Sequence, residues 1–340
     1  MPIRRRLPVC PTCYLPTFMA SITLVVIGDP AAPHMSLLKD LPPEVHIIIS
    51  HDPAELEQQV PRCDVLLNAA FHGRLFRQMF PLAGKARWAH NLSTGVENVL
   101  TPEVMASSLP LTNGRGVFSD ILAEFVAGSI LYFAKDFARM ARNQQAGRWE
   151  QFDVLAVKGA TLAIVGYGDI GRASARLAVG LGMKVVAMRR QNVAAPHDSL
   201  LAAIYPRDRM NDMLATADYL LISAPLTPET RGMIDANALN ALKTDAVLIN
   251  VGRGPIVVEA ALVRALEQGR LKGAALDVFD EEPLPPGHPF YMLKNVLLSP
   301  HCADHLSGWE SMAMMKFLEN FWRFWNDEPL ENIVNKHAGY

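Results

Sequence analysis

The stretch TLAIVGYGDIGRASARLAVGLGMKVVAMRR, residues 161–190, decides the fold of this chain. Its pattern predicts a strand at 161–165, a glycine-rich turn at 166–171, an alanine-rich helix and a second strand at 184–188. The turn has the spacing G-x-G-x-x-G, which opens the helix of a βαβ unit in dinucleotide-binding proteins. Because strand, turn, helix and second strand all occur in the order that the motif requires, we predict dinucleotide binding here.

Glycine is required at three positions of this turn for three different physical reasons. Gly166 permits the tight turn, Gly168 lets the backbone approach a pyrophosphate, and Gly171 lets helix and strand pack closely. The phosphates are then expected at the helix N-terminus, where free N–H groups and the helix dipole favour anions. The cofactor-binding residues predicted on the turn are Gly166, Tyr167, Gly168, Asp169, Ile170 and Gly171.

The end of the second strand indicates which dinucleotide binds. NAD-binding folds usually have Asp or Glu about 20 residues after the glycines, bonded to the ribose 2′-OH. This chain has Arg189 and Arg190 there, and the next carboxylate is Asp198. Since paired guanidinium groups bind a phosphate whereas a carboxylate repels it, the sequence favours NADP(H) over NAD(H). The alternative is that two solvated arginines end the strand.

The composition limits the class of protein. The chain has 340 residues, 50% of them hydrophobic, and a formal net charge of −2. This length suits two domains with large cores, and no basic excess points to nucleic acid. We find no apolar run of the roughly 18 residues that a membrane span needs. Four cysteines do not suggest a disulfide framework, so we expect a reducing compartment and a cytoplasmic protein.

The first 18 residues differ from the rest. Residues 1–18 contain three consecutive arginines and no acidic residue, and Met19 directly precedes the first strand. Three interpretations stay open: an unused upstream start, a short presequence that would make the protein mitochondrial, or a disordered tail. Residues 10–13 have the C-x-x-C spacing of a redox or zinc site, but no second ligand pair lies near them, and we predict no metal.

Strand and helix patterns alternate before the glycine motif. Apolar runs predict strands at 21–27, 45–50, 65–69 and 87–91, and helical segments lie between them, near 28–41, 53–60, 71–80 and 96–105. This is a flavodoxin-like alternation around a parallel sheet. A long helical segment at 119–145 has apolar residues at steps of three and four and suits a connector between domains.

The same alternation continues after the motif. Strands are predicted at 219–223, 246–250, 273–276 and 296–298, with helices at 236–241 and 259–268. Residues 191–212 predict a polar loop and the start of a helix, and an amphipathic helix at 308–325 is expected to return to the first domain. The fold class is therefore α/β with two doubly wound parallel-sheet domains. A flavodoxin-like substrate domain comprises 19–117 and 302–340, and a Rossmann NAD(P)-binding domain comprises 118–301.

Three charged residues follow strands of the second domain. Arg253 comes after AVLIN, Glu282 lies beyond GAALDVF, and His301 follows VLLSP. Ligands of open α/β sheets bind outside the carboxyl ends of the strands. All three side chains are therefore expected to face the cofactor crevice.

Further motifs complete a resemblance to a known family. They are P-L-T-P-E-T at 225–230, N-x-G-R-G at 250–254, D-V-F-x-x-E-P at 277–283 and S-P-H at 299–301. In this combination and order they resemble the D-isomer-specific 2-hydroxyacid dehydrogenases over residues 21–335. The arginine pair resembles that of NADPH-dependent glyoxylate/hydroxypyruvate reductases. The chain lacks the strand-end acid of NAD-using members and the C-terminal extension of many phosphoglycerate dehydrogenases.

The resemblance implies reduction of a small 2-oxo acid to the D-2-hydroxy acid. His301 would donate the proton, for which its ordinary pKa near neutrality is suited. Glu282 would hold the imidazole in its protonated form, with Glu281 as an alternative partner. Arg253 would bind the carboxylate and polarise the carbonyl, because its planar fork suits that task.

Other roles are implied in the same way. The loop Ser93, Thr94, Gly95 and Val96 would bind the substrate carboxylate through backbone N–H groups. Further cofactor contacts are implied for Pro225, Thr230, Val251 and Asp277, and a homodimer through the nucleotide domain is expected. Arg115 and Trp309 are expected at the surface or in packing rather than in the pocket.

Two other functions stay open. One is an oxidative, NAD-linked dehydrogenase of the phosphoglycerate type, which a basic substrate pocket and a preference for NAD would favour. The other is a nucleotide-sensing binding protein like the transcriptional corepressors of the family, which would not need an intact proton donor. Arg189 and Arg190 argue against the first. Arg253, Glu282 and His301 are all present, although corepressors can retain them too.

Overall fold

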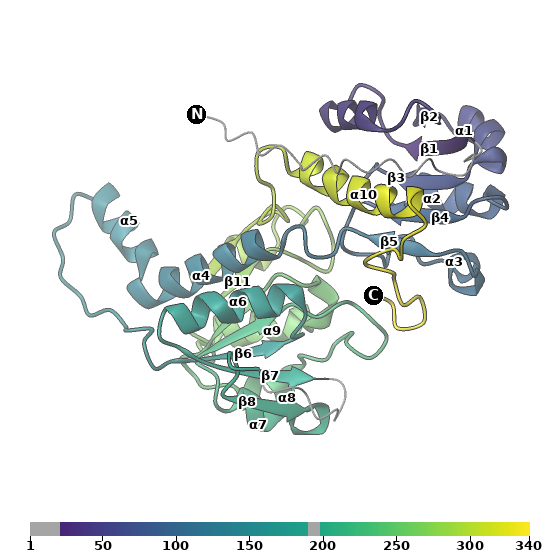
Figure 1. Ribbon diagram of the computed structural model, residues 1–340. Coiled ribbons are helices and arrows are strands. Elements are labelled where there is room, and N and C mark those ends of the chain that lie inside the picture. The colour runs from purple at the N-terminus through teal and green to yellow at the C-terminus, as the bar shows by residue number, and fades with distance from the viewer. Residues whose placement is uncertain (1–20, 190–197) are drawn as a thin grey trace.

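The computed structural model describes residues 21–189 and 198–340 and contains two parallel β-sheets covered by helices (Figure 1). The predicted leader, the C-x-x-C motif and Arg190 lie outside the described residues. The fold class predicted from the sequence is confirmed. In the described ranges, no helix is both long and apolar enough for a membrane crossing.

The first sheet has the strand order β2-β1-β3-β4-β5, the order of flavodoxin-like folds. Its strands are β1 (Ile22–Ile27), β2 (Val45–Ser50), β3 (Val65–Asn68), β4 (Trp88–Asn91) and β5 (Leu111–Asn113). Alternate residues of β1 enter different clusters, with Leu24 and Val26 on one face and Val25 and Ile27 on the other. All four are fully buried, which explains why the strand is a continuous apolar run.

The second sheet has the order β12-β11-β10-β9-β6-β7-β8. Its strands are β6 (Thr161–Val165), β7 (Lys184–Arg189), β8 (Ala203–Pro206), β9 (Tyr219–Ile222), β10 (Val247–Asn250), β11 (Gly273–Leu276) and β12 (Val296–Leu298). The strand order reverses between β6 and β9, which pair directly. In doubly wound sheets the ligand crevice opens at this switch point.

Helices lie between the strands and cover both sheets. Those packed around the first sheet are α1 (Pro53–Gln59), α2 (Arg74–Met79), α3 (Pro102–Ala106) and α10 (Trp309–Trp325), with a 3₁₀ helix at Pro33–Asp40. Those of the second half are α4 (Ser119–Lys135), α5 (Phe137–Gln145), α6 (Asp169–Gly180), α7 (Met210–Leu214), α8 (Ala236–Ala241) and α9 (Glu259–Glu267).

The C-terminal helix returns to the first sheet, as the sequence predicts. Phe317 of α10 stacks on Trp88 of β4 with ring centroids 5.3 Å apart, and both side chains are fully buried. In Figure 1 this yellow helix lies beside the purple and blue strands. The boundaries at 117/118 and 301/302 stay predictions.

The connector is not one helix, contrary to the sequence prediction. Asp136 adopts a left-handed conformation, with φ of 49°, and ends α4. Its side chain accepts a hydrogen bond from the N–H of Arg139, so the same residue is the N-cap of α5. The α4 helix packs along α6, whereas α5 projects away from the body (Figure 1).

Three shorter elements also differ from the sequence prediction. The strands β5 and β8 were not predicted, and β8 lies within the segment expected to be a loop and the start of a helix. The helix expected at 96–105 begins only at Pro102, where Thr101 caps it by accepting from the N–H of Val104. Residues 96–99 instead form a turn, with the N–H of Val99 bonded to the carbonyl of Val96.

Candidate active site

A cavity of about 810 Å³ lies between the two sheets, at the carboxyl ends of their strands. The loops after β3, β4 and β5 line it from the first sheet, and those after β6, β9, β10, β11 and β12 from the second. Of the residues predicted to bind substrate or to react, six line this cavity: Ser93, Thr94, Gly95, Val96, Arg253 and His301. Glu282 is not among the lining residues.

His301 forms a close pair with Glu282. Its Nδ1 lies 2.6 Å from Glu282 Oε2, and the other carboxylate oxygen accepts from the N–H of Phe279 at 2.9 Å. Glu281, the alternative partner, does not make this contact. With Nδ1 engaged, Nε2 is the ring nitrogen left for a ligand in the cavity.

The pairing changes the proton affinity of both groups. The hydrogen bond that His301 donates to Glu282 raises the pKa of His301 above its ordinary value, although burial opposes this. Burial alone would raise the pKa of Glu282, but the hydrogen bonds from His301 and Phe279 outweigh it and hold that pKa below the usual range. The pair therefore favours a protonated imidazole beside an ionised carboxylate.

The loop that carries His301 is held by Asp277. The buried Oδ1 of Asp277 accepts from Ser299 Oγ at 2.6 Å and from the N–H groups of Cys302 and Ala303 at 3.0 and 3.1 Å. His301 itself has a left-handed backbone, with φ of 52°. A non-glycine residue in this conformation costs about 1–2 kcal/mol, so the surrounding contacts must hold it there. Burial raises the pKa of Asp277, against the effect of these hydrogen bonds.

Arg253 spans the cavity to the first sheet. Its Nη1 donates to its neighbour's carbonyl, Gly252 O, at 2.7 Å, and its Nε donates to Glu97 Oε1 at 2.6 Å. Its Nη2 lies so close to Gly95 that a Cβ on that residue would be 1.9 Å away. Only glycine therefore fits at position 95 while Arg253 holds this position.

The loop at 93–96 presents unpaired N–H groups. Its carbonyls are occupied, because Asn91 Nδ2 donates to Ser93 O and Gly95 O, and Asn113 Nδ2 donates to Thr94 O at 2.6 Å. Within 21–189 and 198–340, the N–H groups of Thr94, Gly95 and Val96 have no acceptor. Such a row of free N–H groups in a cavity is suited to an anion.

Glu97 is the site residue that the sequence reasoning missed. It lies 156 positions from Arg253 in the chain, and its contact joins the first half of the molecule to the second. The available signal was its position in the same loop as the predicted carboxylate site. Only the fold shows that its partner is Arg253.

The glycine turn has the geometry of a phosphate site. Gly166 has φ of 98°, and a Cβ there would lie 2.3 Å from the backbone nitrogen of Ala224. A Cβ on Gly171 would lie 2.6 Å from Gly166 O, so this glycine allows close packing of helix on strand. Gly168 has nothing within 4 Å of the place of its Cβ. That open side, at the start of α6, fits a pyrophosphate.

The end of β7 carries Arg189, which the sequence predicts to bind the 2′-phosphate of the cofactor. The guanidinium carbon of Arg189 lies 5.4 Å from the ring centroid of Tyr167. Asp198 lies at the same corner, but its Oδ2 accepts from the Tyr167 hydroxyl at 3.0 Å and its Oδ1 from the N–H of Leu200 at 3.1 Å. Both oxygens of the nearest acid are thus already engaged.

The remaining predicted cofactor residues divide into two groups. Gly168, Asp169, Ile170, Pro225, Val251 and Asp277 line the cavity. Thr230 does not, because its hydroxyl donates to Pro225 O at 2.7 Å and accepts from the N–H of Thr227 at 2.8 Å, which closes its own loop. Gly166, Tyr167, Gly171 and Arg189 also lie outside the lining.

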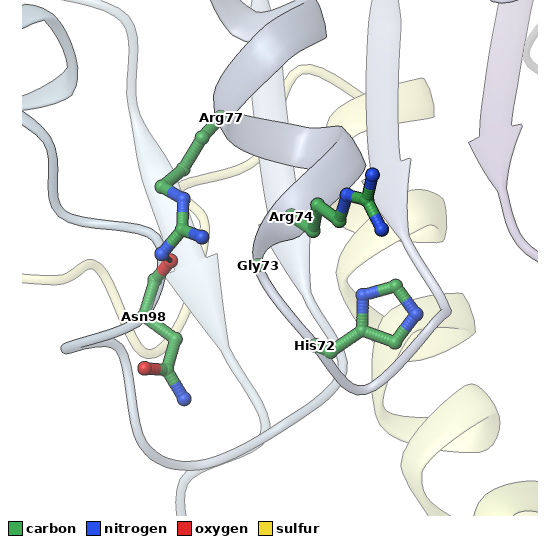
Figure 2. Close-up of a pocket in the computed structure, with 5 residues that line it drawn as sticks. All are labelled: His72, Gly73, Arg74, Arg77 and Asn98. Atoms are coloured by element: carbon green, nitrogen blue, oxygen red, sulfur yellow. Dashed lines mark hydrogen bonds between the residues drawn. The ribbon is translucent and has the colours of Figure 1, made fainter. Parts of the chain in front are cut away.

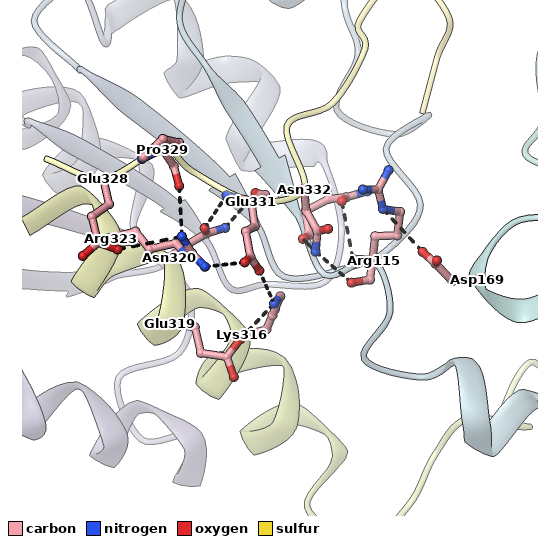
Figure 3. A network of polar contacts seen from close by, with 11 residues as sticks. Arg115, Asp169, Lys316, Glu319, Asn320, Arg323, Glu328, Pro329, Glu331 and Asn332 are labelled. Atoms are coloured by element: carbon pink, nitrogen blue, oxygen red, sulfur yellow. Dashed lines mark hydrogen bonds and ion pairs between the residues drawn. The ribbon is translucent and has the colours of Figure 1, made fainter. Parts of the chain in front are cut away.

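Arg115 and Trp309 line the cavity, although the sequence suggested surface or packing positions. Trp309 does pack, with its ring centroid 4.5 Å from that of Phe71 and 4.7 Å from that of His305. Arg115 Nε lies 3.4 Å from Asp169 Oδ2 at the start of α6, and its carbonyl accepts from Asn332. Figure 3 shows this contact continuing into the network between α10 and residues 328–332.

Comparisons with known proteins show which family this chain resembles. The family model described as D-isomer specific 2-hydroxyacid dehydrogenase, NAD binding domain, matches residues 127–303. A glyoxylate reductase of Korarchaeum cryptofilum is 31% identical over 317 residues, which cover 89% of this chain and 90% of the relative. A glyoxylate reductase of Thermococcus gammatolerans is 30% identical and covers 83% and 88%.

Solved structures of similar proteins share the fold. A D-isomer specific 2-hydroxyacid dehydrogenase from Xanthobacter autotrophicus, in complex with NADPH and MES, has a TM-score of 0.80 and 29% identity, covering 94% of this chain and 100% of the other. An NADPH-dependent glyoxylate/hydroxypyruvate reductase from Sinorhizobium meliloti, in complex with NADP and sulfate, has a TM-score of 0.82 and 26% identity, covering 94% and 100%.

Proposed function

Because the chain belongs to the D-isomer-specific 2-hydroxyacid dehydrogenase family, whose members are NAD(P)-dependent oxidoreductases, we propose that it reduces glyoxylate or hydroxypyruvate to the D-2-hydroxy acid with NADPH. One observation carries the proposal. The His301–Glu282 pair, Arg253 and the loop of unpaired N–H groups meet at one cavity beside the glycine turn. Together they match what a 2-oxo acid needs: an anion site, a polarising cation and a proton donor.

NADPH, when bound, supplies the hydride that goes to the carbonyl carbon. The N–H groups of 94–96 and the Nη2 of Arg253 bind the substrate carboxylate. Arg253 also polarises the carbonyl, and His301 Nε2 gives its proton to the carbonyl oxygen as negative charge develops there. Glu282 keeps the imidazole oriented and charged until that transfer. The imidazole then takes a proton from solvent.

The proposed cofactor site extends from this centre along the second sheet. The turn 166–171 would hold the pyrophosphate, Asp277 and Val251 would lie at the nicotinamide, and Arg189 with Arg190 would bind the 2′-phosphate. The open side of Gly168 supports the first assignment, and the place of Arg189 beside Tyr167 supports the last.

The decisive experiment is a turnover assay with glyoxylate or hydroxypyruvate and NADPH, followed by the loss of NADPH absorbance. We expect steady consumption and formation of the D-2-hydroxy acid. No turnover with any 2-oxo acid in either direction, together with tight dinucleotide binding, would instead favour the corepressor-like binding protein. Turnover only of a hydroxy acid with NAD would favour the oxidative dehydrogenase.

Replacing Arg253 by lysine should damage the enzyme although the charge is kept. Lysine cannot reproduce the planar fork that contacts Glu97 and faces Gly95. We expect kcat/KM for glyoxylate to fall about 10- to 100-fold, as for the loss of one charged hydrogen bond, while NADPH binding measured by fluorescence persists. A lysine variant with wild-type kcat/KM would assign Arg253 a structural role.

Glu97 should act as a positioning residue for Arg253. Glu97→Ala removes the acceptor of Arg253 Nε, so the guanidinium loses its orientation, and we expect kcat/KM to fall about tenfold, chiefly through KM. Glu97→Gln keeps an oxygen at that place and should restore most of the loss. If alanine and glutamine behave alike, the orientation of Arg253 does not depend on this hydrogen bond.

A homodimer is also proposed, and α5 supports it. No residue of α5 is buried, and α5 exposes Phe137 at 46% and Met140 at 42%. Trp149, four residues after the end of α5, is 97% exposed. An exposed apolar patch of this kind usually marks an interface. Sedimentation should give twice the mass of one chain, and Trp149→Glu should shift the protein toward monomer. A wild-type protein that stays monomeric at micromolar concentration would contradict the proposal.

A further inference from the structure

We propose that Arg115 binds the pyrophosphate of the dinucleotide, so that the loops of the first sheet contribute a cation to the cofactor site of the second. This inference rests on the proposed cofactor site at the glycine turn and adds to it a residue from outside that turn. Arg115 lies in the loop after β5 and lines the main cavity together with Gly168 and Asp169.

Few cations are available to a pyrophosphate in this cavity. Of the described residues that line it, only Arg115 and Arg253 are arginine or lysine. Arg253 belongs to the proposed substrate site, where two hydrogen bonds hold its guanidinium group. Arg74 and Arg77, which line the adjoining pocket that Figure 2 shows, and Arg172 of α6 lie outside the lining. Arg115 is therefore the cation that remains for the negative charge of the cofactor.

The backbone of Arg115 is firmly held. Its carbonyl accepts from Asn332 Nδ2 at 2.8 Å, and its N–H donates to Asn113 Oδ1 at 3.4 Å. Next to Asn332, the N–H and the carbonyl of Glu331 both bond to the buried side chain of Asn320 in α10, at 2.8 and 3.0 Å. Figure 3 shows these contacts leading from α10 to Arg115. They fix the base of the arginine side chain at the edge of the cavity.

The guanidinium group of Arg115, in contrast, is loosely held. Within 21–189 and 198–340 its one contact is an ion pair, in which Nε lies 3.4 Å from Asp169 Oδ2. The two side chains are 51% and 54% exposed. An exposed ion pair of this kind contributes little to stability, so a stronger anion can replace the carboxylate as the partner of Arg115.

Asp169 opposes an anion at the place where the pyrophosphate is expected. It is the first residue of α6, and in the described ranges its N–H and that of Ile170 donate to no acceptor. These N–H groups and the open side of Gly168 favour a phosphate, whereas the carboxylate of Asp169 repels it. A guanidinium group beside them removes this conflict, because it neutralises the carboxylate and binds phosphate oxygens through paired N–H donors.

Arg115 therefore has two anions that compete for it. In the protein without cofactor its partner is Asp169. With the dinucleotide bound, the phosphate oxygens become its main partner, and its backbone need not move because the guanidinium group already lies at the start of α6. The cofactor is then held from both sheets, by the glycine turn of the second and by Arg115 from the first.

Calorimetric titration tests this role without any turnover. We compare NADPH with adenosine 2′-phosphate, which has the 2′-phosphate but no pyrophosphate. Arg115→Gln should raise the Kd of NADPH about tenfold, as for the loss of one charged hydrogen bond, and leave the Kd of adenosine 2′-phosphate unchanged. Arg115→Lys keeps the charge and should retain part of the affinity. An unchanged Kd of NADPH in Arg115→Gln would overturn the inference, and glyoxylate turnover by that variant would leave the proposed function standing.

Asp169→Asn should have the opposite effect. It removes the charge that repels the pyrophosphate and that competes for Arg115, so the Kd of NADPH should fall about three- to tenfold. If the Arg115–Asp169 pair serves only to tie the two halves of the molecule together, both variants should weaken NADPH binding alike and lower Tm. That result would contradict the inference.

Arg176→Gln is the matched control. Arg176 of α6 also forms an ion pair with α4, at 2.9 Å from Asp120, and it is 54% exposed, but it does not line the cavity. It should leave the Kd of NADPH unchanged, and a loss equal to that of Arg115→Gln would mean that only net charge matters. A higher KM for glyoxylate at an unchanged Kd of NADPH would place Arg115 in the substrate site instead. Wild-type protein that binds no NADPH would reject the cofactor site itself.

Discussion

His301→Ala should lower kcat for 2-oxo acid reduction about 10²–10⁴-fold, the usual contribution of a positioned general acid. The imidazole lines the cavity, and its Nδ1 is held by Glu282 at 2.6 Å, so alanine removes the only part of this pair that faces the substrate. NADPH affinity should change little, because the glycine turn and Arg189 lie elsewhere. Stopped-flow measurement of NADPH oxidation and fluorescence titration of NADPH separate the two effects.

The pH profile provides the control for this assignment. The hydrogen bond to Glu282 raises the pKa of His301, so the acid form persists to higher pH, and kcat should fall as pH rises through that pKa. Glu282→Gln removes the carboxylate charge and lowers the pKa of the imidazole, so the falling limb should move toward acid. A His301→Ala variant that keeps more than about a tenth of wild-type kcat, or a Glu282→Gln profile that does not move, would contradict the role of this pair.

The sequence predicts this site well where the signal is local. The glycine turn, its flanking strands and the strand-end positions of Arg253 and His301 all follow from short patterns in one segment. The parallel sheets follow from apolar runs, because a strand buried on both faces has no polar alternation. Glu282 could be chosen over Glu281 only as a hypothesis, since both are acidic neighbours, and the structure makes the choice through one contact.

The sequence fails where the outcome depends on distant or very short features. The strands β5 (LTN) and β8 (AIYP) contain polar residues or proline, so they lack the apolar run that marks equally short strands such as β12. The break at Asp136 depends on one residue in a left-handed conformation between two good helices. The contact of Glu97 with Arg253 needs the loops after β4 and β10 to meet, and no spacing along the chain indicates this.

Cofactor choice is the second large effect that we expect. A hydrogen bond to a charged group contributes about 1.5–3 kcal/mol, so one or two contacts from Arg189 and Arg190 to the 2′-phosphate should favour NADPH over NADH by roughly 10- to 1,000-fold in kcat/KM. Arg189 ends β7 beside Tyr167, where an NAD-binding protein would have its ribose-binding acid. Steady-state rates with both cofactors measure the preference, and added salt should weaken it if the contact is exposed to solvent.

Arg189→Asp should reverse this preference. The change removes a phosphate donor and adds an acceptor for the ribose 2′-OH together with a charge that repels the phosphate. Asp198→Asn is the control, because Asp198 lies at the same corner but its oxygens already accept from Tyr167 and Leu200. It should change the ratio of NADPH to NADH use much less than Arg189→Asp does. If the unmutated enzyme uses NADH as well as NADPH, the arginines do not select the cofactor, and an NAD-linked oxidative reaction becomes the better assignment. If Asp198→Asn alone abolishes NADH use, Asp198 is the acceptor for the ribose 2′-OH.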